Sequence, residues 1–165
     1  MSQNPTKAAD NAFCIARKNA AAWSEALNSR EGASELLCID RTRIARIELG
    51  SLIPYPEEVL LMADGYNAPE LLNHYCSTLC PIGCRTQQKL DVAGLDRLVV
   101  KLVSAFRKDD SLGDILLDIT EDGVISKEEM PQLEHVLSQL GRLEKIIGEL
   151  KLWAQKNIQE SEETS

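Results

Sequence analysis

The amino-acid sequence predicts an all-α protein. Apolar residues recur every three or four positions through most of the 165-residue chain, as they do on one face of an α-helix. The alternation of apolar and polar residues that is typical of strands is absent, and only 4% of the residues are aromatic. With 44% hydrophobic and 27% charged residues, the chain has the composition of a globular protein with a packed core.

The first three helices are expected to follow one another closely. A ragged apolar stripe over residues 11–27 predicts the first helix. Ser29 is suited to be the N-cap of a short second helix, Arg30–Leu37, and Asp40 to be the N-cap of a third, Arg41–Leu49. A turn of about three residues would join these two short helices, which is a helix-turn-helix arrangement.

Two further helices complete the expected N-terminal domain. Gly50 is suited to end the third helix, and Pro56 and Pro69 stand where a fourth and a fifth would begin. The segment "CPIGCRTQQK" then combines a proline, a glycine and a polar run, which indicates a domain boundary. We therefore expect a first domain over residues 11–84.

A second, helical domain is expected over residues 90–158. An amphipathic stripe that begins at Leu95 predicts its first helix, and Ser111 is suited to cap a second. After a turn at "EDGVIS", Ser126 and Glu129 form a capping box for a long last helix. The domain would be a helical bundle or hairpin that includes this long terminal helix.

The last helix contains a heptad seam. Its apolar residues are spaced by 3, 4, 3, 4 and 3 positions: Leu133, Val136, Leu140, Leu143, Ile147 and Leu150. Gly141 and Gly148 lie beside the seam and suggest a close helix–helix approach. The seam can pack within one chain or form the interface of a homodimer, and the spacing alone leaves both alternatives open.

The charge is concentrated in the C-terminal half. Residues 1–90 contain nine Lys and Arg against ten Asp and Glu, whereas residues 91–165 contain nine against sixteen. Nucleic-acid binding would therefore need a local basic patch in the first half, while the acidic half suits a protein partner or a ligand signal. Because no apolar run approaches the roughly 20 residues of a membrane span and the N-terminus has no signal-peptide core, we expect a cytoplasmic protein with no membrane partner.

The third helix places its arginines on one face. At ~100° per residue, Ile44 and Ile47 fall on one side, where they can anchor the helix to a core. The opposite side carries Arg41, Thr42, Ala45, Arg46 and Leu49. Such a face suits a DNA major groove, because arginine pairs with guanine edges, threonine contacts the thymine methyl group and alanine permits a close approach. Arg43 lies to the side, where it can reach a phosphate.

The stretch "SREGASELLCIDRTRIARIELGSLIPYPEEVLLMADGYNAPEL" resembles the lambda-repressor-like, Xre-type helix-turn-helix regulators of bacteria and phages. The resemblance covers residues 11–76 and rests chiefly on Ile39, Ile44, Ile47, Glu48 and Gly50 at the family's spacing. It implies a five-helix DNA-binding domain and a transcriptional regulator that recognises a double-stranded DNA sequence. A homodimer would present two recognition helices about one DNA turn apart.

The resemblance also implies roles for individual residues. Arg30 takes the place of a glutamine that usually grips a phosphate, and Glu48 that of a glutamate that often pairs with a first-helix arginine, here Arg17. The base-reading or groove-facing places fall on Arg41, Thr42, Ala45 and Arg46. This sequence departs from the family at Cys38, where glycine is usual in the turn, at Ser34, where a small alanine is usual, and after Gly50, where "SLIP" lacks a basic residue.

Other functions have weaker signals. A protein-interaction module that has the helix-turn-helix fold without DNA binding is the main alternative, since the acidic half would repel phosphate. Cys76, Cys80 and Cys84 are spaced by four residues near His74 and would suit a metal-responsive regulator, although the CxxC pairs of zinc sites are missing and reduced thiols are the simpler interpretation.

A second candidate metal site lies in the C-terminal half. The segment "DITEDGVISKEE" resembles an EF-hand loop through Asp118, Asp122 and Glu129, but no second loop is visible and a plain turn with a capping box between two helices is the favoured interpretation. We expect no cofactor and no resident metal. We also expect no enzymatic activity, because the spacing suggests no nucleophile–histidine arrangement and no glycine-rich phosphate loop.

Overall fold

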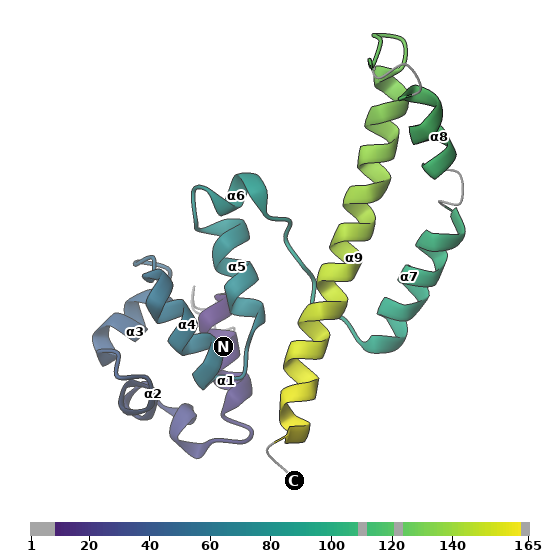
Figure 1. Ribbon diagram of the computed structural model, residues 1–165. Helices are drawn as coiled ribbons and strands as arrows, with labels where there is room; N and C mark the ends of the chain where they lie inside the picture. Colours follow the sequence, from purple (N-terminus) through teal and green to yellow (C-terminus); the bar gives the residue numbers. More distant parts are fainter. Residues whose placement is uncertain (1–8, 109–111, 121–123, 163–165) are drawn as a thin grey trace, which may run out of the picture. The chain divides into compact units, whose positions relative to one another are not determined.

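The computed structural model describes residues 9–108, 112–120 and 124–162, and over these ranges the chain forms helices and no strand (Figure 1). The chain divides between Lys89 and Leu90 into two compact units. The prediction of an all-α protein is therefore confirmed. No helix in the described ranges is both long and apolar enough to cross a membrane.

The first unit contains six α-helices and one 3-10 helix in its described residues. These are α1 (Ala12–Ala20), η1 (Glu25–Asn28), α2 (Arg30–Leu37), α3 (Arg41–Glu48), α4 (Pro56–Gly65), α5 (Glu70–Thr78) and α6 (Gly83–Thr86). They enclose one apolar core to which α1, η1, α2, α3, α4 and α5 all contribute. The largest enclosed apolar side chains are Phe13, Leu27, Ile44, Ile47, Met62 and Leu71.

The prediction of one helix over residues 11–27 is wrong, because α1 ends at Ala20. The amides of Ala22 and Trp23 bond to carbonyls three residues back, which tightens the chain, and Ser24 is extended. The 3-10 helix η1 then brings Leu27 into the core from a separate segment. Apolar residues of the stripe are buried as expected, but they lie on two elements, α1 and η1, rather than on one helix.

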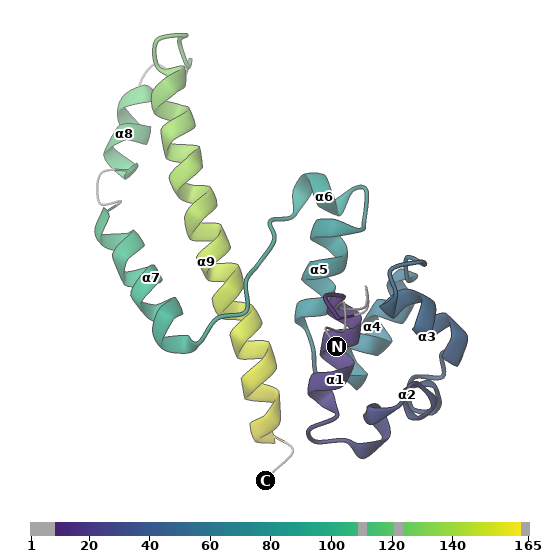
Figure 2. The same cartoon turned by 180° about the vertical axis from the view of Figure 1, so that it is seen from behind.

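The second unit consists of α7 (Leu95–Lys108), α8 (Leu112–Ile119) and α9 (Met130–Glu162). Figures 1 and 2 show α7 and α8 lying side by side with the long α9. At the start of α9, the amide of Ser126 donates to Glu129 Oε2 at 2.8 Å, which is one half of the predicted capping box. The predicted cap Ser111 lies outside the described residues.

A charged cluster lies where α9 packs against α7 and the segment before it. The carboxylate of Glu149 is only 1% exposed and accepts a hydrogen bond from Lys101 Nζ at 2.9 Å. Lys145 Nζ donates to Asp91 at 2.9 Å, and a Cβ added at Gly148 would lie 3.0 Å from Leu90. The close approach expected at this glycine is thus made by an apolar side chain.

The heptad seam lies on the opposite side of α9 from the charged side chains of this cluster, because Lys145 and Glu149 lie about half a helical turn away from it. Leu140 and Ile147 in the seam are 43% and 41% exposed, whereas Val136, nearer α8, is fully buried. Two positions in the middle of the seam, Leu140 and Ile147, are therefore largely uncovered, whereas Leu143 between them is half-buried.

Candidate nucleic-acid interface

Helices α2 and α3 each begin with a side-chain cap, and a tight turn joins them. The Ser29 hydroxyl accepts from the Gly32 amide at 3.0 Å, and the Asp40 carboxylate accepts from the Arg43 amide at 3.0 Å, so both predicted N-caps are confirmed. Between the helices, Cys38 has φ 55° and ψ 32°, the left-handed conformation. The turn thus has the geometry that favours glycine although the residue is cysteine.

The two faces of α3 differ in the way that its periodicity predicts. Ile44 and Ile47 are 0% and 1% exposed in the core. Arg41, Thr42 and Arg46 are exposed, and Ala45 is half-buried between them. Leu49, expected as the last helical residue, is the C-cap, and Gly50 follows with φ +69°.

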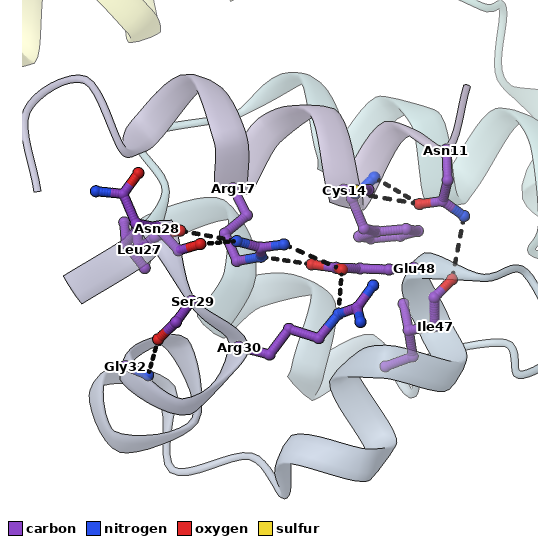
Figure 3. Close-up of polar contacts among 11 residues, drawn as sticks. Asn11, Cys14, Arg17, Leu27, Asn28, Ser29, Arg30, Gly32, Ile47 and Glu48 are labelled. Carbon is purple, nitrogen blue, oxygen red and sulfur yellow. Dashed lines mark hydrogen bonds and ion pairs between the residues drawn. The ribbon is translucent and has the colours of Figure 1, made fainter. Parts of the chain in front are cut away.

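Buried charges hold the C-terminal end of α3 (Figure 3). Glu48, the last residue of α3, accepts hydrogen bonds from Arg17 Nε at 2.6 Å and from Arg17 Nη2 at 3.2 Å. Arg17 Nη1 donates to the carbonyls of Leu27 and Asn28 at 2.8 and 3.3 Å, which ties the same side chain to η1. The predicted pair between Arg17 and Glu48 is therefore present, and it links α1, η1 and α3.

The charge state of this cluster is set by its own hydrogen bonds. Burial acts to raise the pKa of Glu48, but the hydrogen bonds from Arg17 and Arg30 outweigh it and leave that pKa below its ordinary value. The bond to Glu48 in turn raises the pKa of Arg17. Both groups are thus charged at neutral pH, as a buried pair requires.

Arg30, expected to grip a phosphate, is bound to the protein itself. Its Nε donates to Glu48 Oε2 at 2.7 Å, and its side chain is 35% exposed. Figure 3 shows Arg30 and Arg17 approaching the same carboxylate from different elements. The bond to Glu48 uses Nε of Arg30, so a phosphate contact would have to use its two terminal nitrogens.

Arg43, also expected to contact a phosphate, instead connects α3 with α4. Its guanidinium group donates to both carboxylate oxygens of Glu58, from Nε and, at 2.9 Å, from Nη2, and it lies 4.4 Å from the centre of the Tyr55 ring. Glu58 also accepts from the Tyr55 amide at 2.7 Å at the start of α4. The Glu58 carboxylate and the Tyr55 ring thus both contact the guanidinium group. Arg43 therefore positions α3 rather than presenting a cation to solvent.

Arg41 and Arg46 differ in their surroundings. Arg41 Nη1 donates to the carboxylate of Glu31 in α2, and both side chains are well exposed. They line a pocket of about 460 Å³ between α2 and α3, together with Thr42. In the described part of the chain, Arg46 has no carboxylate within ion-pair distance.

Several residues that build this surface were not predicted. Asn11 caps α1 and also donates from Nδ2 to the carbonyl of Ile47 at 3.1 Å, which joins α1 to α3. A Cβ added at Gly32 would lie 2.1 Å from the carbonyl oxygen of Ala26 in η1. The small residue that α2 buries is Ala33, at 0% exposure, and not Ser34. The bond from the Tyr55 amide to Glu58 was also missed, because tyrosine is not one of the usual N-cap residues.

Neither candidate metal site is assembled from the residues that the structure describes. Among the described residues, no group of three or more His, Cys, Asp or Glu side chains could hold a metal ion. Cys80 Sγ accepts from the Gly83 amide at 3.4 Å, and Cys84 is exposed. In the EF-hand-like segment, Glu129 binds the Ser126 amide and Asp118 is exposed, while Asp122 lies outside the described residues.

Comparison with protein-family models, with curated proteins and with solved structures finds no match for this chain. Its function is therefore inferred from the surface that α2 and α3 build.

Proposed function

We propose that the protein is a transcriptional regulator that binds double-stranded DNA sequence-specifically, with a lambda-repressor-like (Xre-type) first unit and α3 as its recognition helix. The observation that carries this proposal is the exposed face of α3. It presents Arg41, Thr42 and Arg46 to solvent, while Ile44 and Ile47 on the other face are buried. A helix anchored along one side by its core and bearing hydrogen-bond donors along the other fits the width of the major groove.

The exposed side chains suit the chemistry of base edges. Arginine can donate two hydrogen bonds to the O6 and N7 atoms of guanine, and the methyl group of threonine can contact that of thymine. Arg41 and Arg46 lie five residues apart on α3 and would contact neighbouring base pairs, while the small Ala45 between them permits close approach. Phosphate contacts would come from the terminal nitrogens of Arg30.

We further propose that the regulator is a homodimer joined through α9. The seam positions Leu140 and Ile147 are exposed on the side of α9 that faces away from α7. A matching seam on a second copy would bury them, as in a coiled coil. Two first units carried by one dimer would then read the two halves of a near-palindrome.

The direct test is selection of bound fragments from a random duplex pool at two salt concentrations. The wild type is compared with Arg41→Ala/Arg46→Ala and with the matched control Arg97→Ala/Arg142→Ala, which removes two exposed arginines from the second unit. We expect the wild type and the control to enrich one motif with an affinity that falls steeply with salt. The first double variant should lose the enrichment and flatten the salt dependence.

A protein-interaction module is the second candidate. Carboxylates already pair with Arg41 and Arg43, and the second unit is acidic, both of which oppose phosphate binding. If neither the wild type nor the control variant enriches any sequence even at low salt, DNA binding is excluded and the exposed face of α3 should be tested against protein partners.

A further inference from the structure

Three of the four arginines along the α2–α3 surface are paired with a carboxylate, but the pairs differ in exposure. Arg30 binds Glu48, whose side chain is 1% exposed, and Arg43 binds Glu58, which is 12% exposed. In the third pair both partners are open to solvent, with Arg41 at 61% and Glu31 at 59%. Only this third pair can exchange its partner without disturbing the core.

The exposed pair lies at the first turns of the two helices. Arg41 is the first residue of α3 and Glu31 the second residue of α2, and both border the pocket between the helices. The bond to Arg41 lowers the pKa of Glu31, so its carboxylate is ionised at neutral pH. A negative charge therefore stands beside the cation that the proposed function assigns to a base edge.

We propose that Glu31 is a specificity-determining residue, whose carboxylate holds Arg41 away from DNA phosphates and yields only part of its hydrogen-bonding capacity to a base. This inference rests on the proposed function. Non-specific binding depends on phosphate contacts, and a carboxylate that occupies Arg41 and repels phosphate weakens it. The bond to Glu31 uses Nη1 of Arg41, so the other guanidinium donors remain for a guanine edge, to which arginine donates two parallel bonds.

Removal of the Glu31 carboxylate should therefore reduce the preference for the enriched motif over random-sequence duplex, and change the affinity for the motif itself less. We expect Glu31→Gln to tighten binding to random-sequence duplex by about twofold to fivefold, since an exposed ion pair is weak. Affinity for the enriched motif should stay the same or fall. The ratio of the two dissociation constants, measured at one fixed salt concentration, should shrink accordingly.

The matched control is Glu35→Gln, which removes the same charge one turn further along the same helix. Glu35 is exposed, and no ion pair joins it to an arginine in the described part of the chain. A double-mutant cycle adds Arg41→Ala and Arg41→Ala/Glu31→Gln, in which loss of the carboxylate should have no more effect than the control. Thermal unfolding of each variant, expected to match the wild type, verifies that the fold is intact.

The outcomes separate the inference from the proposed function. If the wild type enriches a motif but Glu31→Gln and Glu35→Gln behave alike, Glu31 acts only through its charge and the inference is overturned while DNA binding stands. The inference is also overturned if Glu31→Gln raises the affinity for the motif and for random-sequence duplex by the same factor. If the wild type binds no duplex at all, both proposals are overturned.

Discussion

Glu48 shows how much of the first unit depends on a single side chain. It lies 1% exposed at the end of α3 and accepts hydrogen bonds from Arg17 and Arg30, which come from α1 and α2. A buried charge is tolerated only when its partner and its hydrogen bonds are complete. The carboxylate therefore fixes three helices together, and its loss would leave the buried Arg17 without a counter-ion.

We expect Glu48→Gln to lower the free energy of unfolding by about 3 kcal/mol, because it leaves a buried cation uncompensated. The pH dependence should change as well. The folded-state pKa of Glu48 lies below its ordinary value of 4.5, so its contribution is fully present above that pH and is lost as the pH falls through the folded pKa. Chemical denaturation measured at several pH values checks both effects.

The wild type should thus lose stability on acidification below about pH 4.5, whereas the variant should lose less over the same range. Equal pH profiles for the two proteins would show that Glu48 is not held as a carboxylate by the two arginines. Glu57→Gln, which alters an exposed carboxylate in α4, serves as the control.

At the residue level the local pattern predicted short-range interactions, whereas the one distant pair that was predicted, Arg17 with Glu48, came from the resemblance to a family. The caps at Ser29 and Asp40 were predictable because each bonds to an amide three residues away. The pairing of Arg43 with Glu58 spans fifteen residues and an intervening loop, and nothing in the pattern selects that carboxylate over its neighbours. At Cys38 the residue type gave no sign of the conformation. The surrounding helices impose a left-handed turn on a residue that does not favour it.

At the level of elements, the packing of α2 against η1 depends on the absence of one side chain. A Cβ at Gly32 would lie 2.1 Å from the backbone oxygen of Ala26, and a backbone atom cannot move aside as a flexible side chain can. We expect Gly32→Ala to destabilise the protein by about 1–3 kcal/mol, although alanine is the better helix former. Thermal unfolding of the variant measures this.

Gly113→Ala, in α8, is the control for helix propensity, because a Cβ there meets open space. It should be neutral or stabilising. A stabilising effect of Gly32→Ala would show that η1 does not lie against α2 as described.

Helix boundaries were predictable where a cap or a proline marks them, and unpredictable elsewhere. Pro56 begins α4 as expected, and α3 ends within one residue of its predicted end. The end of α1 was missed because its apolar stripe continues into η1, and periodicity cannot distinguish a helix from two short elements that bury the same stripe. The heptad seam of α9 was visible in the sequence, but the sequence did not show which side of α9 packs against α7.

At the scale of the whole molecule, the second unit leaves part of an apolar seam uncovered. We expect the wild type to sediment as a dimer and Leu140→Glu/Ile147→Glu to sediment as a monomer with unchanged helix content, because a charge in a coiled-coil seam is costly to bury. Leu117→Glu is the control, since Leu117 on α8 is 71% exposed and lies outside the seam.

Sedimentation and far-ultraviolet circular dichroism provide the two measurements. A monomeric wild type would exclude the dimer, and a dimer that survives the double variant would place the interface elsewhere. The buried Val136 is left intact in this design, so that loss of the dimer is not confused with loss of the fold.

Hydrogen bonds and ion pairs hold α3 to its neighbours near its start and at its end. Arg43 fixes it to α4, Glu48 to α1 and α2, and the carbonyl of Ile47 to Asn11. None of these attachments uses Thr42, Ala45 or Arg46. Descendants of this protein can therefore exchange those three side chains one at a time during evolution, while the scaffold that carries them is inherited unchanged.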